Sequence, residues 1–202
     1  MKIIIVLIPL LILLGSSSPA NSQIENTQLD WSSLQEAFKT YAEYPSSENA
    51  MKIVEILPDS HVAYNGSKQE KEALDFIYNW EQFRMLERQV FSRDRVAVKL
   101  AFKLRSIADG GFSEDLDIML GTLVRIDPKL FLEELSSAKP EVQQLDHLLA
   151  NEGAIYVDRM DAQCLENQLR IKSLESIKDT SLKKIKYRCI ETLNKIYTKY
   201  CK

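Results

Sequence analysis

The stretch that decides the fold runs from residue 92 to residue 108 and reads SRDRVAVKLAFKLRSIA. Its apolar residues cover much of the helical circumference instead of forming a single stripe. They are Val96, Ala97, Val98, Leu100, Ala101, Phe102, Leu104 and Ile107. A helix with this pattern is buried by neighbours on several sides. We therefore predict a central buried helix over 93–108, capped by Ser92 and ended by the Asp-Gly-Gly turn at 109–111.

Capping residues and apolar stripes predict three helices before this central one. They cover residues 31–44, 46–57 and 67–91. Asp30 is the expected N-cap of the first, and Pro45 ends it. Ser67 and Glu70 form a capping box that opens the third, which we expect to be one long helix contacted from two sides.

Five further helices are expected after the central one. They cover residues 113–126, 128–137, 140–153, 162–175 and 182–200. Asp127 and Pro128 supply a cap and a first-turn proline for the second of these. About nine helices joined by short turns predict an all-α fold of antiparallel pairs, either an α-α superhelix or an irregular helical bundle.

The middle of the chain, residues 92–137, contains a helix, an Asp-Pro turn and a second apolar helix, with LVRIDPKLFL at 123–132. This arrangement resembles the degenerate helix pairs of HEAT-like α-solenoid modules. The resemblance covers about a quarter of the chain. It implies an α-α superhelix with a concave face used for binding, and it transfers no catalytic residue.

The N-terminus has the pattern of a secretory signal peptide. A basic start at Lys2 is followed by an apolar run over 3–14 and by small residues up to Ala20. We predict a signal peptide over 1–20, a disordered segment over 21–29 and a single all-α domain over 30–202. Ser16, and not a cysteine, follows Leu13-Leu14-Gly15, so we expect a secreted or periplasmic protein that is not a lipoprotein.

The charge balance limits the classes of partner. The chain carries 26 Lys and Arg against 29 Asp and Glu, a net charge of −3. This excludes a basic nucleic-acid binder and a strongly basic membrane-surface protein. No second apolar run of spanning length follows the signal, so we expect no membrane span in the mature chain.

All three cysteines lie near the C-terminus, at Cys164, Cys189 and Cys201. In an oxidising compartment two of them are expected to pair. If the last two helices turn at 178–179, Cys164 faces 192–194, which is closer to Cys189 than to Cys201. We therefore predict a Cys164–Cys189 disulfide and a free thiol at Cys201.

No catalytic, cofactor-binding or metal-binding constellation is found in the sequence. The two histidines, His61 and His147, lack the spacing of a metal site, and no phosphate-binding loop or nucleophile elbow is present. The acidic group Glu114, Asp115 and Asp117 is interpreted as the first turn of a helix, where negative charge is stabilised. We expect no cofactor.

The Asn65-Gly66-Ser67 sequence matches a glycosylation sequon, which has meaning only in a eukaryotic secretory pathway. The same residues suit a turn before the Ser67 cap, so both interpretations stay open. The absence of a dense cysteine framework favours a bacterial periplasmic or secreted protein.

Aromatic residues concentrate in the first third of the chain, and most are expected to fill the core. Tyr44, Tyr64 and Trp80 are the candidates for contact with a partner. The leading hypothesis is a non-catalytic helical binding or scaffold protein that recognises a protein or peptide. The alternatives are a periplasmic immunity protein that inhibits a toxin and a small enzyme with converging carboxylates.

Overall fold

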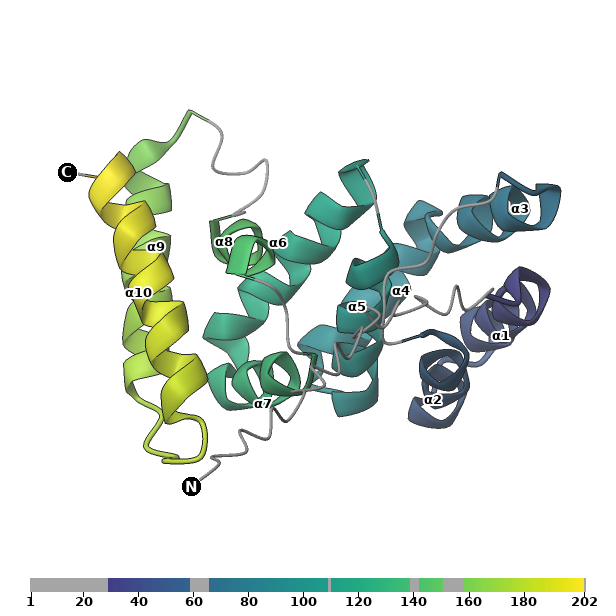
Figure 1. The fold of residues 1–202 in the computed structure, drawn as a ribbon, viewed down its shortest axis with the longest axis horizontal. Helices are drawn as coiled ribbons and strands as arrows, with labels where there is room; N and C mark the ends of the chain where they lie inside the picture. Colours follow the sequence, from purple (N-terminus) through teal and green to yellow (C-terminus); the bar gives the residue numbers. More distant parts are fainter. Residues whose placement is uncertain (1–28, 59–65, 109, 139–141, 151–157, 202) are drawn as a thin grey trace, which may run out of the picture.

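A computed structural model describes residues 29–58, 66–108, 110–138, 142–150 and 158–201 of the chain (Figure 1). The predicted signal peptide and all but the last residue of the segment expected to be disordered lie outside these ranges. So do Tyr64 and Asn65. The described part begins at Leu29, which is buried in the core.

The described residues form ten helices and no strand, which confirms the all-α class. The helices are α1 (Trp31–Glu43), α2 (Ser47–Ile56), α3 (Lys68–Ile77), α4 (Trp80–Phe91), α5 (Arg95–Ile107), α6 (Gly110–Ile126), α7 (Pro128–Ala138), α8 (Val142–Ala150), α9 (Met160–Glu175) and α10 (Lys183–Tyr200). None of the described helices is long and apolar enough to cross a membrane.

The helices stack in two layers along the long axis of the molecule (Figure 1). One layer consists of α2, α5, α7 and α10, each in contact with the next. The other contains α1, α3, α4, α6, α8 and α9. Pairs of consecutive helices, such as α1 with α2 and α6 with α7, join the layers. The resemblance to HEAT-like modules stays a prediction, because two stacked layers do not by themselves define a repeat.

The predicted central helix is confirmed as α5. It contacts α2, α4, α6 and α7, and it buries seven side chains of its thirteen residues. Its N-cap differs from the prediction. Asp94, and not Ser92, caps the helix, because its Oδ1 accepts hydrogen bonds from the backbone N–H groups of Val96 and Ala97. Ser92 instead ends α4.

The single long helix predicted over 67–91 is wrong. The chain leaves the helical conformation at Asn79, whose side chain accepts a hydrogen bond from the N–H of Glu81 and so caps a new helix, α4. Tyr78 ends α3, and its ring stacks on Phe112 of α6 at 4.1 Å between centroids. The hydrogen bond of the Asn79 side chain to the backbone competes with continuation of the helix. The apolar periodicity of residues 67–91 continues across this break and therefore does not reveal it.

Other predicted caps are confirmed. Asp30 accepts a hydrogen bond from the N–H of Ser33 at the start of α1. Ser67 accepts one from the N–H of Glu70 at the start of α3. The Glu70 carboxylate reaches back past the cap and accepts a hydrogen bond from the N–H of Gly66. Helix α6, in contrast, begins at Gly110 and not at Ser113.

The inner face of α9 is polar. Its buried residues are Glu166, Asn167, Arg170 and Leu174. The guanidinium of Arg170, 1% exposed, donates from Nε to Glu166 Oε1 at 3.0 Å and from Nη1 to the carbonyl oxygen of Leu149 at 3.0 Å. Glu166 Oε2 also accepts from Arg125 Nη1 of α6 at 2.7 Å. These contacts join α9 to α6 and α8.

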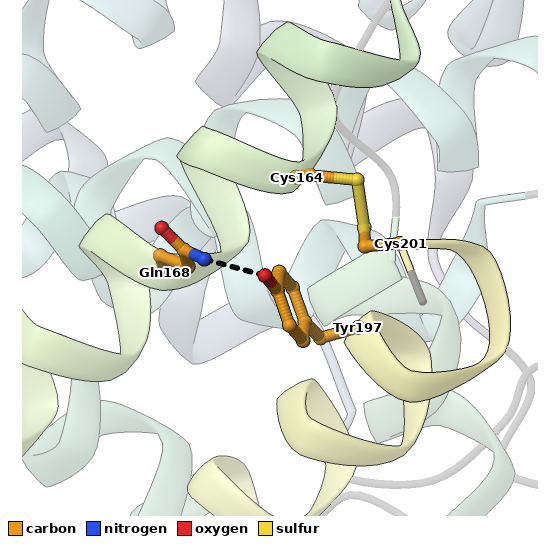
Figure 2. The surroundings of a disulfide bond; sticks show 4 residues. All are labelled: Cys164, Gln168, Tyr197 and Cys201. Atoms are coloured by element: carbon orange, nitrogen blue, oxygen red, sulfur yellow. Dashed lines mark hydrogen bonds between the residues drawn. A yellow bond between two sulfur atoms is a disulfide. The ribbon is translucent and has the colours of Figure 1, made fainter.

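The predicted Cys164–Cys189 disulfide is wrong. Cys164 is bonded to Cys201, with 5.7 Å between the two Cα atoms (Figure 2). Cys189 is a free, fully buried thiol, and burial raises its pKa to about 12. The bond joins the N-terminal part of α9 to the residue that follows α10.

The position of the turn explains the error. Lys186 Nζ donates to the carbonyl oxygen of Ile177 at 2.8 Å, and Gln168 Nε2 donates to the hydroxyl of Tyr197 at 2.6 Å (Figure 2). Both contacts place the centre of the hairpin near Leu182, after the predicted centre at 178–179. Because the two helices run antiparallel, moving the centre of the turn by a given number of residues moves the residue of α10 that faces Cys164 by twice that number. Cys164 therefore meets the end of α10.

A test of the polar junction is the substitution Gly121→Ala. An added Cβ would lie 2.9 Å from the Leu148 carbonyl oxygen and 3.1 Å from Arg170 Nη1. We expect the free energy of unfolding to fall by about 1–3 kcal/mol, because the junction must shift to accept the methyl group. Chemical denaturation measures the change. The control is Gly111→Ala in the same helix, where an added Cβ would have no neighbouring atom within 4 Å. An equal loss of stability in both variants would contradict the close packing assigned to Gly121.

The disulfide assignment is tested with Cys201→Ser. Releasing a loop closed over 37 residues should lower the free energy of unfolding by about 4 kcal/mol. A reducing agent should destabilise the wild-type chain and Cys189→Ala but leave Cys201→Ser unchanged. Denaturation curves with and without reductant make the comparison. If the reducing agent destabilised Cys201→Ser but not Cys189→Ala, the result would contradict the Cys164–Cys201 bond and support a Cys164–Cys189 bond.

Candidate binding site

The two described members of the predicted aromatic set are both exposed. Tyr44 follows α1 and is 63% exposed, and Trp80 begins α4 and is also 63% exposed. The ring of Trp80 lies 5.9 Å from that of Phe83 and carries the guanidinium of Arg84 at 5.4 Å. Among the described residues, no ring contact joins Tyr44 to Trp80. The structure thus presents two separate exposed aromatics and not one aromatic groove.

Other aromatics of the first third are core residues, as expected. Trp31 and Tyr41 are both buried. Burial raises the pKa of Tyr41 to about 12, with the carboxylate of Asp94 acting in the same direction. These two rings are therefore out of reach of a partner.

A hollow of about 440 Å³ lies between α5 and α7, beside Pro58, which follows the C-cap residue of α2. We call it the α5–α7 hollow. Its described lining consists of Pro58, Lys99, Phe102, Lys103, Ser106, Glu134, Ser137 and Ala138. The volume is within the usual range for small-ligand and peptide pockets. Neither the lysines nor the serines stand out in sequence, because exposed polar positions on a helix normally face bulk solvent.

Helical periodicity places the lining residues of α5 together. Lys99, Phe102, Lys103 and Ser106 are spaced three or four residues apart, so their side chains share one face of the helix. The floor at Phe102 is fixed by packing, since its ring lies 6.0 Å from the ring of buried Phe131 in α7. The site is consequently built on two packed helices.

Cations line the α5 side of the hollow. Lys103 Nζ donates to the carbonyl oxygen of Leu57 at 2.6 Å, where α2 ends. A cation at this position stabilises the carbonyl end of a helix. Lys99 lies one helical turn earlier, is exposed, and makes no ion pair with a described residue.

The α7 side holds a single lining carboxylate, that of Glu134. Its side chain is only 9% exposed, and its Oε1 accepts from Arg95 Nη1 at 2.7 Å. The other end of the same guanidinium pairs with Glu133, and this bond raises the pKa of Arg95. Glu134 thus shares one guanidinium with Glu133, while the ammonium of Lys99 on the α5 side has no ion-pair partner among the described residues.

Chemically, the α5–α7 hollow is suited to binding an anionic group next to an apolar one. Its lining combines two ammonium groups, two hydroxyls and the faces of Phe102 and Pro58. No group of three or more His, Cys, Asp or Glu residues that could hold a metal ion occurs in the described part of the chain.

A second, larger depression of about 690 Å³ lies on α10. Its described lining comes from that helix alone, between Tyr187 and Lys199. A depression lined by one helix is an open face and gives no convergent groups for recognition. Within the described residues, the α5–α7 hollow is the better candidate.

The acidic group of α6 has a different role from the one predicted. Because α6 begins at Gly110, the three carboxylates lie beyond its first turn. Asp117 is buried and forms an ion pair with Arg105 of α5. Burial nevertheless holds the pKa of Asp117 above its usual value, and Arg105 opposes this shift. The pair is a structural link between two helices.

His147 is exposed on α8, while His61 lies outside the described residues. The neighbouring Asp146 accepts a hydrogen bond from the hydroxyl of Thr192 on α10 at 3.4 Å. These groups connect α8 to α10 and do not converge on a cavity.

Comparison of the chain with protein-family models, with curated proteins and with solved structures found no match.

The ion pairs beside the hollow are tested with Arg95→Met. Removal of the guanidinium leaves the carboxylate of Glu134 nearly buried and unpaired, so we expect the free energy of unfolding to fall by about 1–2 kcal/mol. Lys52→Met is the matched control. Lys52 is as exposed as Arg95 (55% against 57%), but its partner Glu48 is 82% exposed. Its loss should cost about 0.5 kcal/mol or less.

The double variant Arg95→Met with Glu134→Gln completes this test. The neutral amide removes the unpaired buried charge, so the double variant should regain part of the lost stability. Urea denaturation of the wild type, Arg95→Met, Glu134→Gln and the double variant gives the coupling energy between the two side chains. Equal destabilisation by Arg95→Met and Lys52→Met would contradict the role assigned to Glu134.

Proposed function

We propose that this protein is a non-catalytic binding module that recognises a protein or peptide partner outside the cytoplasm. The observation that carries the proposal is the α5–α7 hollow, in which charged, polar and apolar groups of two helices converge on one recess. A largely preformed recess in which polar groups fix the orientation of a ligand beside an apolar surface is the usual form of a binding site.

The arrangement of the hollow supports binding over catalysis. Its one described carboxylate, Glu134, is already paired with Arg95. General acid–base catalysis by two carboxylates would need a second one close by, and the described lining contains none. The lysines and hydroxyls present are suited to holding a polar ligand in place.

Two features support a location outside the cytoplasm. The N-terminal sequence has the order of a secretory signal, with a basic start, an apolar run and small residues. The Cys164–Cys201 bond is of a kind that persists in oxidising compartments. The secreted or periplasmic assignment is part of the proposal.

The proposal is tested by site-specific photo-crosslinking in living cells of the source organism. A photoreactive phenylalanine analogue replaces Ser137 in the hollow, or Tyr44 or Trp80 among the exposed aromatics. The control position is Lys184, an exposed lysine on α10. We expect one partner protein to be cross-linked from at least one of the three positions and not from Lys184. The purified partner should bind the full chain with a Kd of about 10 μM or tighter by calorimetry.

Absence of any cross-linked partner, or a cross-linked protein that does not bind when purified, would contradict the proposed function. The position that reacts also discriminates between sites. A product from Ser137 alone identifies the hollow as the binding surface, whereas products from Tyr44 or Trp80 alone assign binding to the exposed aromatics.

A further inference from the structure

We propose that the α5–α7 hollow binds an acidic segment of a peptide chain, with Lys99 as the residue that contacts its carboxylate. This inference rests on the proposed function and names the chemistry of the partner.

The arrangement of cations along α5 is the first argument. Arg95, Lys99 and Lys103 lie one helical turn apart on the same side of the helix. The guanidinium of Arg95 holds two carboxylates of α7, and the ammonium of Lys103 holds the carbonyl oxygen of Leu57. Lys99, between them, has no ion-pair partner among the described residues. Of these three cations, Lys99 is therefore the one whose positive charge can pair with a group of a ligand.

The internal pairing of Glu134 strengthens this argument. A carboxylate in the lining could otherwise neutralise Lys99, but the oxygen of Glu134 accepts from Arg95 at 2.7 Å. An incoming carboxylate therefore meets the ammonium group of Lys99, while the one described carboxylate of the lining is already held by Arg95. Charge complementarity selects an anionic ligand here, even though the whole chain carries a net charge of −3.

The remaining lining fits a peptide better than a free inorganic anion. The rings of Phe102 and Pro58 and the methyl group of Ala138 offer apolar contact beside the lysines. The hydroxyl of Ser137 donates to the carbonyl oxygen of Glu133 at 3.1 Å. Its oxygen keeps lone pairs that can accept an N–H group. A peptide supplies all three counterparts, namely a carboxylate, an apolar side chain and a backbone N–H group.

Phosphate-rich ligands such as nucleic acids fit the hollow less well. Phosphate recognition is usually strongest with the two-pronged guanidinium of arginine. The guanidinium one helical turn before Lys99, that of Arg95, is already held by Glu133 and Glu134. The two lysines act as point charges, which suits a single carboxylate.

The experiment is selection of a displayed library of random twelve-residue peptides on the immobilised full chain with its disulfide intact. We expect the enriched peptides to share an Asp or Glu next to an apolar residue. The best synthetic peptide is then titrated against the wild-type chain, Lys99→Glu and Lys184→Glu. Both variants make the same change in net charge at an exposed helical lysine, but only Lys99 lines the hollow.

Lys99→Glu should weaken binding of the peptide at least tenfold, and Lys184→Glu should change it less than twofold. Replacing the acidic residue of the peptide by its amide should weaken binding to the wild-type chain similarly and have little further effect on Lys99→Glu. Unfolding curves of both variants confirm that they are folded. Lys99→Gln serves as the second variant and should lose affinity to a smaller extent.

Other outcomes overturn the inference. Enriched peptides without acidic residues, or equal effects of Lys99→Glu and Lys184→Glu, would show that the hollow does not select an acidic segment. If a cross-linked partner is found at the same time, the proposed function still holds. A library without enriched peptides likewise overturns the inference, while cross-linking decides the proposed function independently.

Discussion

The buried guanidinium of Arg170 is the constraint on which the C-terminal half of the structure depends. It lies 1% exposed where α6, α8 and α9 meet, and an unpaired charge in such a place costs several kcal/mol. Two contacts offset this cost, one to the carboxylate of Glu166 and one to the carbonyl oxygen of Leu149 near the end of α8. A helix end leaves such carbonyls without intrahelical donors, and its dipole favours a cation. The three helices can therefore meet in only a few relative positions.

The same junction determines where the last hairpin attaches. Gly121 of α6 allows the backbone of α8 and the Arg170 side chain to approach closely, since a Cβ there would lie 2.9 Å from the Leu148 oxygen. Glu166 also receives the guanidinium of Arg125, so one carboxylate holds two cations. With α9 held in this way, α10 contacts both α7 and α8 and extends the layer formed by α2, α5 and α7. The disulfide then joins the open end of the hairpin, away from its turn.

Sequence reasoning succeeds where a signal is local and fails where it depends on a distant contact. The caps at Asp30 and Ser67 and the central position of α5 were predictable, because they depend on neighbouring residues or on the composition of one helix. The inner face of α9 was not, since Glu166, Asn167 and Arg170 give no apolar stripe. The disulfide was mispredicted because a hairpin register depends on the packing of its loop. The lysines of the hollow could not be identified, because only tertiary structure places α7 opposite them.

The position of the hollow on α5 separates the residues that stabilise the fold from those to which we assign recognition. Val98, Ala101 and Leu104 lie on the faces of α5 that are buried in the core. Lys99 and Ser106 lie on the face toward the hollow, and Lys99 has no described partner whose loss would destabilise the fold. Because a helix has 3.6 residues per turn, successive side chains point in different directions. Val98 can therefore lie in the core while the adjacent Lys99 faces the hollow. Lys99 can therefore change without altering the core, while α2, α6 and α7 continue to hold α5 in place. A side chain on a packed helix is held in a more precise position than one on a loop, which suits the binding role that we propose for Lys99.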